Sequence, residues 1–245
     1  MIIDELIYRI RHNFCHVPTA EQEQAIGQFA SFMTNRREEA VMVLRGSAGT
    51  GKTTLAAAIV KTMAELQQRM VLLAPTGRAA KVFSLYSGHS AYTIHRRIYR
   101  QQSLEGAFCL NYNNTQDTLF IVDEASMISS GTGFQNDSLF GSGELLDDLV
   151  TFVYSGDGCR LLLVGDTAQL PPVGEEESPA LQDETFRRYG LLTGSADLTD
   201  VVRQQSRSSV VSEATLVRQW QEQNVPDAFP PLHTSETGEV RSHMQ

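Results

Sequence analysis

Residues 46–54 read Gly46-Ser47-Ala48-Gly49-Thr50-Gly51-Lys52-Thr53-Thr54 and fit the pattern G-x-x-x-x-G-K-[ST] of a phosphate-binding loop. The apolar run 40–44 before them is typical of a buried strand, and residues 53–60 after them predict a helix. Glycines allow backbone N–H groups to turn toward phosphate oxygens, and the N-terminus of a helix adds partial positive charge. The sequence therefore predicts a nucleoside triphosphate site. The alternative, an ordinary glycine-rich turn, does not account for these flanks.

The loop motif also predicts the roles of individual side chains. Lys52 is expected to reach the β- and γ-phosphates, and the Thr53 hydroxyl is expected to be a ligand of Mg²⁺. The whole loop is predicted to contact the nucleotide through Gly46, Ser47, Ala48, Gly49, Thr50, Gly51, Lys52, Thr53 and Thr54.

Two further apolar runs carry polar residues at their carboxyl ends. Residues 118–122 are followed by Asp123 and Glu124. Asp123 is predicted to hold Mg²⁺, and Glu124 to orient or deprotonate an attacking water molecule. Residues 160–164 are followed by a segment with Gln169, whose amide can sense a γ-phosphate by changing its hydrogen bonds when that phosphate leaves. The alternative for Gln169 is an ordinary turn before two prolines.

These elements predict an α/β domain with a mostly parallel sheet and helices on both faces. The predicted strands are 40–44, 70–74, 118–122, 160–164 and a short one that starts at Asp197. A chain of 245 residues is long enough for one large α/β domain, or for one domain and part of another.

Residues 76–100 contain five basic residues and no Asp or Glu, although the chain has a net charge of −9. The basic residues are Arg78, Lys81, Arg96, Arg97 and Arg100. The aromatic and imidazole rings between them are Phe83, Tyr86, Tyr92, His95 and Tyr99. Basic side chains beside aromatic faces are typical of a channel for single-stranded nucleic acid. The alternative is a charged helix face above a few core aromatics.

Composition narrows the class of protein. The acidic net charge argues weakly against binding duplex DNA through the whole surface, but it allows a local basic groove. Three widely spaced cysteines, Cys15, Cys109 and Cys159, predict reduced thiols of a cytosolic protein rather than a disulfide framework or a metal site. The sequence has no apolar run of 18 residues and no signal-peptide pattern at its start, so no membrane contact and a cytoplasmic location are expected.

Residues 18–22, Pro-Thr-Ala-Glu-Gln, predict the start of a helix. Thr19 suits the N-cap, and Gln22 lies three residues later, where it would complete a capping box. One alternative for Gln22 is that it is a cap partner only.

Taken in order, these motifs resemble the motor of superfamily 1B DNA helicases, in the RecD-like branch of the exodeoxyribonuclease V alpha chain. The matching segments are 18–22 (Q motif), 46–53 (motif I), 74–80 (motif Ia), 92–95 (the next DNA-contacting motif), 122–126 (motif II), 164–173 (motif III) and 198–204 (motif IV). The resemblance implies a three-layer RecA-like P-loop NTPase domain over residues 18–200. An N-terminal helix (1–17), a small insertion (about 101–117) and the start of a second RecA-like domain or a linker (201–245) would complete the chain.

The resemblance also implies ATP as the nucleotide, with Gln22 reading the adenine and Arg203 acting as a γ-phosphate arginine. The implied catalytic set is Lys52, Asp123, Glu124, Gln169 and Arg203, with Thr53 and Asp123 on Mg²⁺. The implied contacts to single-stranded DNA are Pro75, Thr76, Gly77, Arg78, Lys81, Thr93, His95 and Arg96.

The resemblance implies a DNA helicase that couples ATP hydrolysis to 5′-to-3′ movement on single-stranded DNA and unwinds the duplex. It also implies possible helicase or nuclease partner subunits and a role in DNA repair and recombination. The family's later motifs are absent, so the chain is expected to be a truncated fragment whose own hydrolysis is weak or lost. One alternative is a nucleotide-gated module that binds single-stranded DNA without motor activity. Another, a small-molecule kinase, leaves residues 76–100 and Gln169 without a task.

Overall fold

The computed structural model describes residues 2–35, 39–101, 108–130 and 141–202. Residues Met1–Asp200 form one compact unit, separate from Val201–Gln245. The predicted γ-phosphate arginine, Arg203, lies outside the described residues. So does the rest of the predicted second-domain start, apart from Val201 and Val202.

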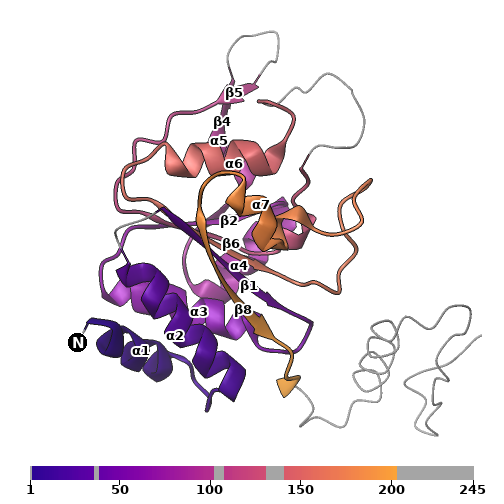
Figure 1. The fold of residues 1–245 in the computed structure, drawn as a ribbon. Helices are drawn as coiled ribbons and strands as arrows, with labels where there is room; N and C mark the ends of the chain where they lie inside the picture. The colour runs from indigo at the N-terminus through magenta and orange to yellow at the C-terminus, as the bar shows by residue number, and fades with distance from the viewer. Residues whose placement is uncertain (1, 36–38, 102–107, 131–140, 203–245) are drawn as a thin grey trace, which may run out of the picture. The chain divides into compact units, whose positions relative to one another are not determined.

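The core of the unit is a six-stranded sheet in the order β3-β2-β6-β7-β1-β8 (Figure 1), in which every neighbouring pair of strands is parallel. Its strands are β1 (Ala40–Gly46), β2 (Met70–Ala74), β3 (Ala91–Thr93), β6 (Leu119–Val122), β7 (Arg160–Gly165) and β8 (Leu192–Leu198). Because parallel strands end at the same edge, the carboxyl ends of β1, β6 and β7 meet there. This is the edge at which the sequence places its predicted nucleotide site.

Helices connect the strands and cover both faces of the sheet. They are α1 (Ile2–Asn13), α2 (Ala20–Thr34), α3 (Lys52–Glu65), α4 (Gly77–Ser87), α5 (Ile94–Ile98), α6 (Leu145–Tyr154) and α7 (Asp183–Arg187), with short 3-10 turns η1 (Ala125–Met127) and η2 (Pro179–Leu181). A parallel sheet needs such crossovers, because its strands all run in one direction. The predicted fold class, an α/β P-loop domain with helices on both faces, is confirmed.

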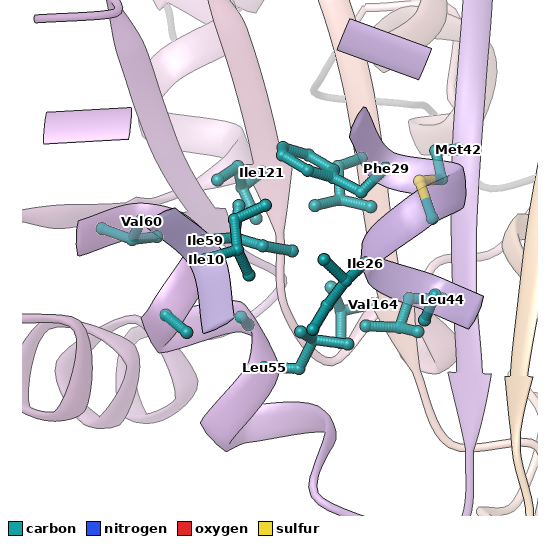
Figure 2. Close-up of a cluster of buried hydrophobic side chains, with 14 of the residues drawn as sticks. Ile10, Ile26, Phe29, Met42, Leu44, Leu55, Ile59, Val60, Ile121 and Val164 are labelled. Carbon is teal, nitrogen blue, oxygen red and sulfur yellow. The ribbon is translucent and has the colours of Figure 1, made fainter. Parts of the chain in front are cut away.

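Side chains of β1 alternate between the two faces, as the period of a strand requires. Met42 and Leu44 pack with buried residues of α1, α2, α3 and α4, whereas Val41 and Val43 pack with those of α5, α6 and α7. Figure 2 shows the first of these clusters, in which Ile26 and Phe29 of α2 point toward the sheet. Both side chains are fully buried. Truncating such a side chain to Ala typically costs about 2–5 kcal/mol of stability, so this layer contributes strongly to the fold.

The start of α2 has the predicted cap. The Thr19 hydroxyl accepts a hydrogen bond from the Gln22 backbone N–H (3.3 Å), and the Gln22 side-chain oxygen accepts one from the Thr19 backbone N–H (3.0 Å). This reciprocal pair is a capping box, so the predicted helix start is confirmed.

One strand differs from the expectation. The strand predicted to start at Asp197 is β8, which begins earlier, at Leu192, and ends at Leu198. As an edge strand with only Ala196 and Leu198 buried, it lacks the continuous apolar run that marks β1 and β7. In the region of the predicted insertion, β5 (Phe108–Leu110) pairs antiparallel with β4 (Tyr99–Gln101). Among the described residues, no helix is both long and apolar enough to cross a membrane.

Candidate functional site

The glycine-rich loop follows β1 and leads directly into α3. A Cβ atom at Gly46 would lie 2.7 Å from the backbone oxygen of Leu198, so only glycine allows β8 to approach this closely. Gly51 has a φ of +90° and precedes the first residue of α3. A Cβ atom there would lie 2.5 Å from Nε2 of Gln22. The glycines at both ends of the loop are therefore required by its geometry.

The ammonium group of Lys52 lies within the loop. It donates hydrogen bonds to the backbone oxygens of Gly46 (2.7 Å) and Ser47 (2.9 Å) and lies 3.5 Å from Oδ2 of Asp166. Burial lowers the pKa of Lys52, and the negative charge of Asp166 opposes this shift. The loop thus holds its cation with carbonyl oxygens, which are groups that phosphate oxygens could replace.

Asp166 lies within the segment 164–173, but the sequence motifs assign it no role. It directly follows β7, and β7 is paired with β1 so that Gly165 lies opposite Arg45. The buried Asp166 carboxylate also accepts a hydrogen bond from the Ala168 backbone N–H (2.9 Å). The only signal for Asp166 in the sequence is its position just after the apolar run 160–164, because the pairing of that run with the loop strand is seen only in the structure.

The two predicted carboxylates follow β6. Oδ2 of Asp123 accepts a hydrogen bond from the Tyr86 hydroxyl. Burial raises the pKa of Asp123 and also the pKa of Tyr86. Glu124 has a φ of +55°, which is uncommon outside glycine and marks a strained backbone. Its Oε2 accepts a hydrogen bond from Nε2 of Gln169 (2.9 Å), and Oε1 of Gln169 accepts one from Ser126 (2.9 Å). The structure therefore brings together Glu124 and Gln169, which the sequence places 45 positions apart.

Gln22 contacts the loop directly. Its side chain is 2% exposed, and Nε2 donates a hydrogen bond to the backbone oxygen of Thr50 (2.9 Å). Oε1 is already occupied by the capping box. The preceding residue, Glu21, accepts hydrogen bonds from the backbone N–H groups of Thr199 (2.6 Å) and Asp200 (2.9 Å). The first turn of α2 thus joins the loop to the residues that follow β8.

Arg45 forms a second link at this edge of the sheet. Its guanidinium donates to Oδ1 of Asp183 (2.8 Å), to Oδ1 of Asp197 (2.7 Å) and to the backbone oxygen of Leu181 (2.8 Å). The Arg45 side chain is only 16% exposed, and its hydrogen bonds to the two aspartates outweigh burial and raise its pKa. The residue immediately before the loop is therefore tied to β8 and α7 at once.

The predicted DNA contacts lie where two neighbouring strands end. β2 and β3 are paired so that Ala74 lies opposite Thr93. Thr76 and Thr93 are the N-caps of α4 and α5, and each hydroxyl accepts a backbone N–H at 3.2 Å. Pro75 and Gly77 flank Thr76 at the start of α4.

The basic and aromatic residues of this region divide between surface and core. Arg78, Lys81 and Arg96 are exposed, and the Arg96 guanidinium lies 5.6 Å from the ring centre of Tyr92. Burial lowers the pKa of His95, whose ring centre is 5.6 Å from that of Tyr99.

The prediction that the rings of residues 76–100 present their faces to nucleic acid is wrong for Phe83 and Tyr99, and Tyr86 packs inward as well. Phe83 (0% exposed) and Tyr99 (7% exposed) lie in the core, because α4 and the start of β4 pack them against the sheet. Tyr92, 42% exposed, is a surface ring.

A glycine loop between a strand and a helix, with carboxylates at the ends of parallel strands, defines the class of P-loop nucleotide-binding domains. Within this class, the chain belongs to the AAA domain family, whose model matches residues 18–243. Its homology to superfamily 1B helicases is distant and extends over most of the chain.

Two curated relatives are helicases. The chain is 30% identical to the ATP-dependent RecD2 DNA helicase of Deinococcus radiodurans over 204 residues, which are 81% of this chain and 24% of that protein. It is 27% identical to the ATP-dependent DNA helicase dda of Enterobacteria phage T4 over 194 residues, which are 76% of this chain and 40% of that protein. The chain therefore spans less than half the length of each.

A solved structure shares the fold. The crystal structure of Pif1 helicase from Candida albicans matches with a TM-score of 0.53 and 20% identity, over 86% of this chain and 46% of that one. At this identity the likeness concerns the fold alone.

Proposed function

We propose that this chain is the ATP-binding part of a DNA helicase motor, which hydrolyses ATP to move 5′ to 3′ along single-stranded DNA and unwind duplex. The observation that carries the proposal is the position of Lys52, whose ammonium lies inside the glycine loop beside Asp166. The distant relatives supply the reaction class, since both are named as ATP-dependent DNA helicases. In this proposal residues 18–200 are the first RecA-like domain, and residues from 201 on begin the second.

The residues present fit a magnesium–nucleotide complex. Lys52 donates to carbonyl oxygens of its own loop, so phosphate oxygens can take over the same hydrogen bonds. Thr53 is exposed in the first turn of α3, and Asp123 is the carboxylate proposed to share the metal with it. Among the described residues no cluster of three or more His, Cys, Asp or Glu could hold a metal. A Mg²⁺ ion at Thr53 and Asp123 would therefore depend on phosphate oxygens for further ligands, as is usual for this ion.

Each catalytic residue then has one task. Bound Mg²⁺ would supply charge neutralisation at the phosphates. Lys52 would offset negative charge on the β- and γ-phosphates, and Glu124 would orient the attacking water. Gln169, which donates to Glu124, would report whether the γ-phosphate is present. Arg203 is proposed to complete the site, and Gln22 to read the adenine once its amide leaves Thr50.

The test is ATP hydrolysis by this chain with and without single-stranded DNA, together with a Lys52→Ala variant. Hydrolysis that DNA stimulates and that Lys52→Ala abolishes supports the motor. Nucleotide-dependent DNA binding without turnover supports the alternative, a gated DNA-binding module. Turnover that survives in Lys52→Ala overturns the assignment of the site. Helicase or nuclease partner subunits and a role in repair and recombination remain proposals from the RecD-like resemblance.

A further inference from the structure

Tyr86 connects α4 to the predicted magnesium carboxylate. Its ring is largely buried against Phe83, with 5.2 Å between the ring centres, and packs on the core between the helices and the sheet. Its hydroxyl donates a hydrogen bond to Oδ2 of Asp123, which lies 37 positions further along the chain. The sequence pattern did not predict this contact, since it indicated only that Tyr86 is one of the rings beside the basic residues of 76–100.

The same helix presents a different set of side chains to solvent. Arg78 and Lys81 are exposed, and so are the apolar side chains of Val82 (50%) and Leu85 (76%). These residues make up the outer face of α4, where the proposed DNA contacts gather. α4, a helix of 11 residues, therefore carries proposed DNA contacts on its outer face and, through Tyr86, contacts Asp123, the proposed magnesium ligand.

Strand pairing fixes the distance between the helix and the carboxylate. α4 follows β2, and β2 pairs with β6 so that Leu73 lies opposite Val122. The backbone N–H of Asp123 donates to the Leu73 oxygen at 3.0 Å. A movement of α4 relative to this pair of strands would therefore act on Asp123 through the Tyr86 hydroxyl.

The hydrogen bond fixes the orientation of the Asp123 carboxylate. A partner that orients a metal ligand in this way typically changes metal affinity about 10–100-fold.

We propose that Tyr86 is a positioning residue that couples the outer face of α4 to Asp123, so that a bound DNA strand and bound magnesium–nucleotide strengthen each other. The proposal rests on the proposed function of the site. Because binding linkage is reciprocal, DNA must tighten magnesium–nucleotide binding by the same factor by which magnesium–nucleotide tightens DNA binding.

The test measures this factor without catalysis. A fluorescent non-hydrolysable ATP analogue with Mg²⁺ is titrated with and without a thymidine oligonucleotide, for wild type, Tyr86→Phe and Tyr154→Phe. Tyr86→Phe removes only the hydroxyl. Tyr154→Phe is the matched control, because it removes a hydroxyl that donates to the Ala40 oxygen (2.7 Å) at the opposite end of β1 from the loop.

We expect DNA to tighten binding about fivefold or more in wild type and in Tyr154→Phe, a typical size for coupling between sites. In Tyr86→Phe the factor should fall to within about twofold of 1. Nucleotide binding in EDTA should be equal in all three proteins. Tyr86→Leu, which also removes the ring, should lose the coupling to the same extent, provided that its thermal unfolding shows a folded chain.

The outcomes distinguish a failure of the Tyr86 role from a failure of the proposed function. Coupling that persists in Tyr86→Phe, or no coupling in a wild-type chain that binds both ligands, overturns the role of Tyr86 and leaves the proposed function intact. A wild-type chain that binds no nucleotide overturns the proposed function and the coupling with it.

Discussion

The side-chain amide of Gln22 donates a hydrogen bond of 2.9 Å to the backbone oxygen of Thr50, so the first turn of α2 is attached to the phosphate-binding loop. The other end of the amide closes the capping box with Thr19. A residue that the resemblance assigns to adenine recognition therefore makes two contacts within the protein. Both must be considered when its substitution is interpreted.

Gln22→Ala should destabilise the chain by about 1–3 kcal/mol, because it removes two largely buried hydrogen bonds of about 0.5–1.5 kcal/mol each. Urea unfolding measures this change. Gln24→Ala, at an exposed position of the same helix, is the control and should stay within about 0.5 kcal/mol of wild type.

The same variant separates two roles in nucleotide binding. If Gln22 mainly holds the loop, Gln22→Ala weakens ATP and GTP binding by similar factors. If it reads adenine, only ATP binding weakens. Because adenine recognition is the proposed role of Gln22, we expect ATP binding to weaken more than GTP binding. Equal losses for the two nucleotides would contradict that role and assign Gln22 to holding the loop through Thr50.

Arg45→Met should destabilise the chain by about 1–3 kcal/mol, the range for hydrogen bonds to charged groups. The substitution keeps the apolar stem but leaves the carboxylates of Asp183 and Asp197 without their shared cation. The control is Arg187→Met, whose ion pair with Glu184 is mostly exposed and should contribute under about 1 kcal/mol. Equal urea midpoints for the two variants would show that the Arg45 contacts do not stabilise the fold.

Sequence patterns predicted the parts of the molecule that depend on local residues. The sequence predicted the loop from its glycine pattern. It predicted β1, β2, β6 and β7 because buried parallel strands are continuous apolar runs. The cap at Thr19 was visible because its partner lies three residues away. β3, at three residues and only partly buried, carries no comparable signal.

The contacts that organise the site could not be predicted, because they join segments distant in sequence. Asp166 reaches Lys52 across 114 positions, and Arg45 reaches Asp197 across 152. Tyr86 looked like a surface ring because the basic residues around it suggest exposure, whereas its position on α4 directs it inward. Such pairs depend on strand order, and the strand order follows from tertiary packing.

Glu21→Gln should make stability less dependent on acid pH. Burial opposes ionisation of Glu21, but the hydrogen bonds from Thr199 and Asp200 outweigh it and hold its pKa below the ordinary value of 4.5. A carboxylate whose pKa is lower in the folded state stabilises fully above its unfolded value and loses that contribution as pH falls through the folded value. Wild type should therefore be more stable than Glu21→Gln near neutral pH, and the difference should shrink below about pH 4.5. Urea unfolding across this range measures it, and a difference that does not change with pH would contradict the sign.

Single-stranded DNA binding by the chain should weaken with salt, because basic side chains that neutralise phosphates release counterions. The slope of log K against log salt should be about −0.7 for each phosphate neutralised. Arg78→Ala and Lys81→Ala, at exposed positions of α4, should each reduce the magnitude of the slope by about 0.7. Lys61→Ala, at an exposed position of α3 outside the proposed DNA contacts, is the matched control and should leave it unchanged. If the affinity were independent of salt, or if Lys61→Ala changed the slope as much as Arg78→Ala, the outer face of α4 would not be the surface that binds single-stranded DNA. The coupling role of Tyr86 would then lose the surface on which it depends.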